Sequence, residues 1–134
     1  MTKALPEQQN HPELLAPAGN IESFFAALEH GADAIYVGHR HHSARALAAN
    51  FTLEEIARLR EYAHGHGVKL YVALNAIVRE DELADLIGVL SGLAQIQPDG
   101  LIIQDGAVAR LCRLYFPNLT IHASTLMTVH NRAG

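Results

Sequence analysis

The sequence predicts an α/β fold that forms part of a TIM-like (β/α) barrel, with about four and a half βα units and parallel strands. Three observations support this prediction. Short apolar runs alternate with longer segments of helical period, the runs contain few polar residues, and they begin at residues 13, 34, 69, 100 and 120. Eight βα units in about 250 residues imply roughly 31 residues per unit, which is close to this spacing.

Five apolar runs are the predicted strands. Sequences such as LYVALN and GLIIQ are apolar almost throughout, which is typical of parallel strands covered on both faces. Successive residues of such a strand point to opposite faces of the sheet. The predicted strands are residues 13–17, 34–38, 69–75, 100–105 and 120–124.

The segments between the first three strands are predicted helices. The first has apolar residues at i, i+3, i+4 and i+7, which form one stripe for packing on a sheet. The second begins at Thr52, because Thr52 and Glu55 have the spacing of a capping box, and it ends at Gly65 and Gly67. The stripe of the first helix consists of Ile21, Phe24, Phe25 and Leu28.

Two more helices and the start of another follow. Asp105 is a suitable N-cap for a helix that runs to Phe116 and stops at Pro117. Cys112 lies on the apolar face of that helix, so we expect it to pack in the core. The closing residues TLMTVHNRAG begin a further helix. The helix before the fourth strand has an apolar stripe that consists of Leu83, Leu86, Ile87 and Leu90.

Length and composition limit the classes of function. The 134 residues allow one domain, which we place at residues 13–134 after a flexible arm at 1–12. A formal net charge of −4 gives no electrostatic footprint for nucleic-acid phosphates. No apolar run approaches the roughly 18 residues that span a bilayer, and the amino terminus lacks the pattern of a secretion signal. We therefore expect a cytoplasmic protein with no membrane partner.

We predict no metal ligand within this sequence. Its single cysteine, Cys112, excludes an intrachain disulfide and a self-contained iron–sulfur site. The run GHRHHS places three histidines on a loop after the second strand, which invites a metal hypothesis. No further ligand stands at a known spacing, however, and a solvated loop explains the run equally well.

Candidate substrate-binding residues follow the strands, because (β/α) folds build their sites at the carboxyl ends of the strands. Asn75 closes the apolar strand LYVALN, so its amide must be bonded locally or face a cavity. Helix capping is the simpler interpretation of Asn20 and Asp105. Amides, a carboxylate and hydroxyls together suit a small polar substrate with carbonyl or carboxylate groups. The candidates at strand ends are Asn20, Asn75, Gln104, Asp105, His122 and Ser124.

Alternation places His122 and Ser124 on one face of the fifth strand, and we expect both to point into the barrel. With Asp105 one strand away, a Ser–His–Asp arrangement can be drawn, in which the imidazole would activate the hydroxyl. Neighbours at i and i+2 seldom bring a hydroxyl and a ring nitrogen into line, and an inner layer of hydrogen-bonded polar residues explains the pair equally well. The sequence therefore identifies no catalytic residue.

Four blocks with matching order and spacing carry a resemblance to a known family. They are ELLAPAGNIESFFAALEHGADAIYVG, SARALAANFTLEEI, HGVKLYVALN and DGLIIQDGAVARLCRLYFPNLTIHAST, and Asn131 follows them. Together they resemble the amino-terminal half of the U32 peptidase family, the collagenase-like proteases. This resemblance implies a barrel-like catalytic domain and a hydrolase of the peptidase type, with the family's cysteine-containing motif lying beyond Gly134.

The resemblance leaves three functions open. The first is the amino-terminal portion of a peptidase, not active on its own because an unfinished barrel cannot present all of its loops. The second is half of an oxygen-independent hydroxylase that acts on RNA or a ubiquinone precursor, with an iron–sulfur cluster on downstream cysteines. The third is a non-catalytic half-barrel that forms a homodimer through its open edges.

Arg45 lies in the block SARALAANF, which the resemblance includes. A guanidinium there could clamp the carboxylate of a peptide terminus or of a dicarboxylate such as prephenate. An ion pair with Glu54 or Glu55 explains this arginine equally well. The expected ligand is therefore a peptide or a small carboxylate-bearing molecule.

Overall fold

The computed structural model of the protein describes residues 11–44 and 48–133. Its centre is a parallel sheet of five strands in the order β1-β2-β3-β4-β5, so each strand pairs with its predecessor in the chain. This arrangement confirms the predicted α/β fold and is that of part of a (β/α) barrel. The strands are β1 (Leu15–Ala18), β2 (Ala34–Gly38), β3 (Lys69–Leu74), β4 (Gly100–Ile103) and β5 (Ile121–Ala123).

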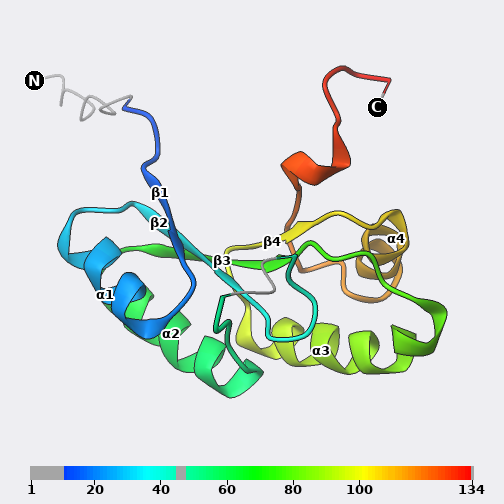
Figure 1. Ribbon diagram of the computed structural model, residues 1–134, viewed down its shortest axis with the longest axis horizontal. Helices are drawn as coiled ribbons and strands as arrows, with labels where there is room; N and C mark the ends of the chain where they lie inside the picture. Colours follow the sequence, from blue (N-terminus) through cyan, green and yellow to red (C-terminus); the bar gives the residue numbers. More distant parts are fainter. Residues whose placement is uncertain (1–10, 45–47, 134) are drawn as a thin grey trace, which may run out of the picture.

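Helices α1, α2 and α3 lie along one face of the sheet (Figure 1). The predicted capping box at the start of α2 is present, since Thr52 Oγ1 accepts the N–H of Glu55 at 3.3 Å. Gly67, with a φ of 71°, allows the chain to turn after α2. No helix in the described part of the chain is long and apolar enough to cross a membrane. The helices are α1 (Ile21–Glu29), α2 (Leu53–Gly65), α3 (Leu83–Ile96) and α4 (Gly106–Tyr115), with the single 3₁₀ turns η1 (Glu80–Glu82) and η2 (Thr125–Met127).

The hydrophobic core lies between the sheet and its helices. Leu70 of β3 and Leu101 of β4 are fully buried in one cluster with the helix residues Phe24 and Leu90. Burial of each such side chain stabilises the fold by roughly 1.5–3 kcal/mol. Cys112 of α4 is also buried in this cluster, as the sequence predicts.

The opposite face of the sheet, which we name the inner face, is not covered by a helix within the described ranges (Figure 1). In-register pairing places Tyr36 beside Tyr71 on this face, and Ile102 beside His122. The segments that precede β1 and follow β5 both project on this side of the sheet (Figure 1). The inner face is where the interior of a complete barrel would lie.

The last segment differs from the sequence prediction of a further helix. Only the single turn η2 forms, and no regular element follows it through residue 133. Ser124 Oγ accepts the N–H of Leu126 at 3.2 Å and so starts the turn. Thr128 then adopts a left-handed conformation, with a φ of 54°, which stops helical propagation after one turn.

Candidate functional site

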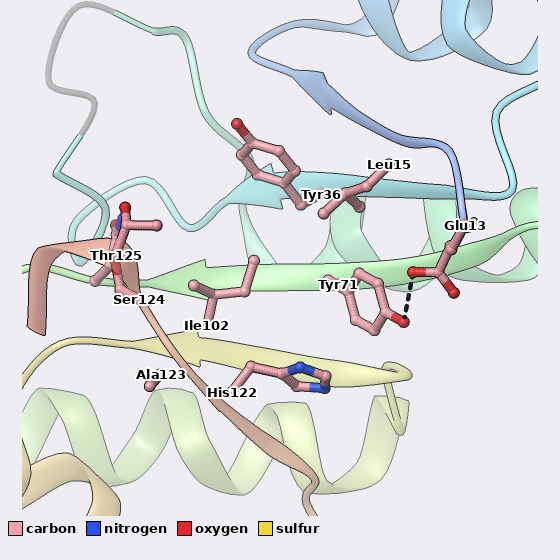
Figure 2. Close-up of a pocket in the computed structure, with 10 residues that line it drawn as sticks. Glu13, Leu15, Tyr36, Tyr71, Ile102, His122, Ala123, Ser124 and Thr125 are labelled. Atoms are coloured by element: carbon pink, nitrogen blue, oxygen red, sulfur yellow. Dashed lines mark hydrogen bonds between the residues drawn. The ribbon is translucent and has the colours of Figure 1, made fainter. Parts of the chain in front are cut away.

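A pocket of about 410 Å³ opens on the inner face of the sheet. Figure 2 shows side chains from all five strands, or from residues next to them, around this space. Its position on the uncovered face makes it the candidate site, and we name it the inner-face pocket. Its lining residues are Glu13, Leu15, Tyr36, Tyr71, Asn75, Ile102, His122, Ala123, Ser124 and Thr125.

Three side chains form one hydrogen-bonded group near the amino-terminal ends of the strands. The Tyr71 hydroxyl donates to Glu13 Oε1 at 3.2 Å (Figure 2), and the Lys69 ammonium donates to Glu13 Oε2 at 2.8 Å. Partial burial and the nearby Glu13 carboxylate raise the pKa of Tyr71, and the bond to Glu13 raises the pKa of Lys69. Tyr71 is therefore protonated at neutral pH, and the Glu13 charge is balanced by an ammonium.

The ring of His122 lies against the ring of Tyr71. Their centroids are 5.2 Å apart and their planes are inclined by 54°. Gly100 of β4 makes this approach feasible, because a Cβ atom at that position would lie 2.8 Å from His122 Cδ2 and 3.1 Å from Tyr71 Cδ1. The glycine therefore provides the space for the two rings to meet over the sheet.

Amide and hydroxyl groups lie near the carboxyl ends of the strands. Asn75 follows β3 directly, and its Oδ1 accepts the N–H of Ala44 at 3.0 Å. Ser124 follows β5 and is 6% exposed, while Thr125 begins η2 beside it. Three of the lining residues in this region, Asn75, Ser124 and Thr125, thus carry uncharged polar side chains.

The other predicted strand-end candidates lie outside the inner-face pocket. Asn20 Oδ1 accepts the N–H of Ser23 at 2.8 Å and caps α1. Asp105 caps α4 through the N–H of Ala107 at 2.8 Å, and its second oxygen accepts the N–H of Val78 at 3.0 Å. Gln104 is half-buried after β4 and does not line the pocket. Arg45 lies outside the described residues.

The residues of the hypothetical Ser–His–Asp arrangement are occupied elsewhere. Both carboxylate oxygens of Asp105 bind backbone N–H groups, and Ser124 Oγ accepts the N–H of Leu126. The ring of His122 packs on Tyr71. His122 and Ser124 both line the pocket, as alternation predicts, but the geometry does not assemble a nucleophile, base and carboxylate in line.

The histidine run after β2 is only partly the solvated loop that the sequence allowed, because His41 is exposed while the other two histidines are buried. His39 is 5% and His42 is 4% exposed, and their rings stack with centroids 5.5 Å apart. His42 Nε2 lies 3.0 Å from Asp85 Oδ2 of α3. Burial, followed by the nearby His42, lowers the pKa of His39 to about 4. Among residues 11–44 and 48–133, no group of three His, Cys, Asp or Glu side chains is placed to hold a metal ion.

Sequence reasoning missed the residues that give the pocket its aromatic and apolar character. Tyr36, Tyr71 and Ile102 all line it, yet none of them stands at a strand end. Alternation was the available signal, because it places Tyr71 on the same face of β3 as Asn75. Strand-end position alone, which identifies Asn75, does not point to these three side chains.

The described lining of the pocket combines flat apolar surface with uncharged polar groups. Rings and aliphatic side chains line its centre, and amide and hydroxyl groups lie near the carboxyl ends of the strands. No arginine or lysine is among its described lining residues, and the nearby Lys69 ammonium is bound to Glu13. The described lining thus offers ring faces together with hydrogen-bonding groups, and the predicted cation Arg45 lies outside the described residues.

Comparisons with known proteins find one matching family and several similar sequences. The profile described as peptidase family U32 matches residues 19–134. The tRNA hydroxylation protein P1 of Bacillus subtilis is 38% identical over 120 residues, which cover 90% of this chain and 28% of that protein. A 23S rRNA 5-hydroxycytidine synthase of Escherichia coli is 40% identical over 113 residues, which cover 84% of this chain and 17% of that protein.

A solved structure of a U32 peptidase has the same fold. It superposes with a TM-score of 0.70 over 89% of this chain and 51% of that chain, at 16% sequence identity. The likeness supports the architecture of β1 to β5 and their helices and carries no information about activity.

Proposed function

The chain belongs to peptidase family U32, and we propose that it forms the amino-terminal part of an enzyme that hydroxylates RNA. One observation carries this proposal. The chain is 38% identical, over 90% of its length, to a protein named for tRNA hydroxylation. A second relative, at 40% identity, is named for the synthesis of 5-hydroxycytidine in 23S rRNA. The hydroxylase alternative is therefore better supported than the peptidase interpretation.

Among the described residues, neither Ser124 nor Cys112 is placed to act as the nucleophile of a peptidase. Activation of a nucleophilic hydroxyl needs a base within hydrogen-bond reach. Ser124 Oγ instead accepts a backbone N–H at the start of η2, and His122 lies against Tyr71. The only cysteine of the sequence, Cys112, is buried in the core, and burial raises the pKa of its thiol. A buried thiol with a raised pKa is a poor nucleophile.

The iron–sulfur cluster that the family resemblance implies does not fit these residues. Such a cluster requires four cysteine thiolates or equivalent ligands. Cys112 is the single cysteine of the sequence and packs among apolar side chains on α4. We therefore assign no cluster ligand to this chain and derive no step through a cluster.

The role of this chain in such an enzyme follows from its charge and its pocket. A net charge of −4 disfavours strong contact with RNA phosphates. The inner-face pocket offers rings and uncharged polar groups, which suit contact with a base. We assign base binding to this part of the enzyme and phosphate binding to other parts of it.

The test uses the complete reading frame that contains this sequence. It is expressed in an Escherichia coli strain that lacks its tRNA and rRNA hydroxylating relatives. Total tRNA and rRNA are digested, and the nucleosides are compared by mass spectrometry with those of the strain carrying an empty vector. Recovery of pyrimidine nucleosides with one added oxygen atom supports the proposal. Unmodified RNA together with cleavage of a labelled gelatin substrate by the purified protein contradicts it.

A further inference from the structure

Three rings face the inner-face pocket from three different strands. Tyr36, Tyr71 and His122 come from β2, β3 and β5 and are all partly or well exposed. Figure 2 shows that Tyr71 points toward Glu13 while the Tyr36 ring points away from it. The two tyrosine rings thus diverge, although their backbones are paired in register. The exposed ring area is suited to stacking or edge contact with another planar group.

The polar groups of the pocket are uncharged where they meet the carboxyl ends of the strands. Asn75 Oδ1 and Ser124 Oγ each accept a backbone N–H, so these two residues offer the amide N–H groups of Asn75 and the O–H of Ser124 as donors, while the Thr125 hydroxyl can donate and accept. Glu13, the one carboxylate among the described lining residues, lies at the other end and is bound to Lys69 and Tyr71. A ligand with alternating carbonyl and N–H groups on its edge matches this set better than an anion does.

The size of the pocket limits its occupant. A volume of about 410 Å³ is in the range of small-molecule sites and admits one ring with its sugar. A base inside a duplex cannot reach such a concave site, so the nucleotide must be unpaired or turned out of its stack. RNA sequences are read mostly in this way, by stacking of splayed bases on aromatic side chains.

Resting on the proposed function, we propose that the inner-face pocket binds a single unpaired pyrimidine base of the RNA substrate, with the rings of Tyr36 and Tyr71 in stacking or edge contact with it. Amide and hydroxyl groups of Asn75, Ser124 and Thr125 are the partners for the base edge. This proposal differs from the carboxylate-bearing ligand expected from the sequence, and it rests on the rings and uncharged polar groups of the described lining. It makes Tyr36 and Tyr71 binding residues and assigns them no part in the oxidation.

The four tyrosines of the chain provide an internal control for a binding experiment. Tyr36 and Tyr71 line the pocket, whereas Tyr62 lies on α2 and Tyr115 on α4. The purified 134-residue chain, labelled with ¹³C in its tyrosine rings, is titrated with uridine and with cytidine and followed by NMR. Nucleosides without phosphate are used so that the net negative charge of the chain does not oppose binding.

The expected result is a saturable change in the chemical shifts of the Tyr36 and Tyr71 rings, while the shifts of Tyr62 and Tyr115 stay unchanged. Tyr71→Leu should weaken binding by about fivefold or more, as loss of one stacking side chain does. Tyr71→Phe keeps the ring and should bind within about twofold of the unaltered chain. Tyr115→Leu, which changes a tyrosine that is 69% exposed on α4, is the matched control. Unchanged chemical shifts of Tyr36 and Tyr71 on addition of the nucleosides would overturn the proposal, and so would shifts that succinate causes and the nucleosides do not.

The outcomes separate this inference from the proposed function. RNA hydroxylation by the full reading frame, together with unmoved tyrosine rings and full activity of Tyr71→Leu, overturns base binding and leaves the function intact. Saturable ring movement without RNA hydroxylation overturns the proposed function and leaves pyrimidine binding in place. Hydroxylation that requires a higher RNA concentration in Tyr71→Leu but not in Tyr71→Phe supports both.

Discussion

The imidazole ring of His39 stacks on that of His42, with 5.5 Å between the centroids and 16° between the planes. Both rings are buried, and His42 Nε2 lies 3.0 Å from Asp85 Oδ2 on α3. The loop that carries them is also bonded to β3 and to the residues after it, since His39 N–H donates to Ala73 O and Ala76 N–H donates to His42 O. The pair thus joins three elements at the carboxyl ends of the strands.

We predict that this histidine pair makes the fold sensitive to acid. Burial, followed by the nearby His42, lowers the pKa of His39 from 6.5 to about 4; His41 and Arg40 lower it further, and the Asp85 carboxylate opposes them. The unfolded chain therefore binds the proton more readily than the folded one. The contribution of neutral His39 to the free energy of unfolding should be fully present above pH 6.5. The free energy of unfolding should then fall by about 3 kcal/mol as the pH decreases to about 4.

Urea unfolding at pH values across that range measures the loss. His39→Phe keeps a ring against His42 but cannot take up the proton, so its stability should depend less on pH than that of the unaltered chain. Equal pH dependence of the two proteins would contradict the assignment to His39. Burial opposes ionisation of Asp99, yet its bond to His64 brings its pKa below the ordinary value of 3.8, so the stability that Asp99 contributes is lost only below about pH 3.8, outside the range assigned to His39.

We predict that Asp105 contributes more to stability than an ordinary helix cap. Its two carboxylate oxygens bind the N–H groups of Ala107 and Val78, so it joins α4 to the segment after β3. Asp105→Ala should lower the free energy of unfolding by about 2–4 kcal/mol. Asp105→Ser keeps a cap but does not reach Val78, and should cost about half as much. Asn20→Ala, which removes only the cap of α1, should cost about 1 kcal/mol.

Thermal or urea unfolding of the three variants checks this order of stability. A loss in Asp105→Ala no larger than that in Asn20→Ala would show that the bond to Val78 adds nothing. If Asp105→Ser is as stable as the unaltered chain, the bond to Val78 likewise adds nothing to stability.

We predict that Gly100→Ala alters the inner-face pocket without unfolding the chain. The new Cβ would lie 2.8 Å from the His122 ring and 3.1 Å from Tyr71 Cδ1. His122 is an exposed side chain on the last strand, so it can rotate away at small cost. Stability should change by less than about 1 kcal/mol, while the NMR signal of Tyr71 shifts and uridine binds more weakly. Unaltered uridine binding with a displaced His122 ring would show that this ring does not shape the pocket.

Local signals in the sequence predict the elements and their caps well. The capping box of Thr52 and Glu55 involves residues three apart, and the strands are apolar runs that need no partner to be recognised. The candidate site depends on longer connections. Tyr71 meets Glu13 across 58 positions of the chain, and His42 meets Asp85 across 43. No periodicity encodes such pairs, because they arise only when the strands and helices pack.

Asn75 and Asp105 show how far strand-end reasoning goes. Asn75 does close a strand and does line the pocket, but the Ala44 N–H bound to its oxygen could not be foreseen. Asp105 is a cap, as its position suggests, and its second partner, Val78, comes from a loop that follows another strand. The tyrosines were open to prediction from alternation, since a strand exposes every second residue to the inner face.

We predict that the 134-residue chain self-associates through β5. This prediction names the strand that forms the homodimer expected from the open edges of the sheet. Within the described residues β1 and β5 are the two edge strands, and β1 contains Pro17, which has no N–H to offer a partner. On β5 the backbone groups of Thr120 and Ser124 bind β4. By alternation, those of Ile121 and Ala123 face outward.

Ala123→Pro removes one outward N–H from β5 and places a residue that edge strands tolerate. We expect size-exclusion chromatography with light scattering to show a concentration-dependent dimer for the unaltered chain and a monomer for Ala123→Pro. Thermal unfolding should be nearly unchanged, because this N–H is not used in pairing with β4. A dimer that persists in a folded Ala123→Pro variant would contradict association through β5.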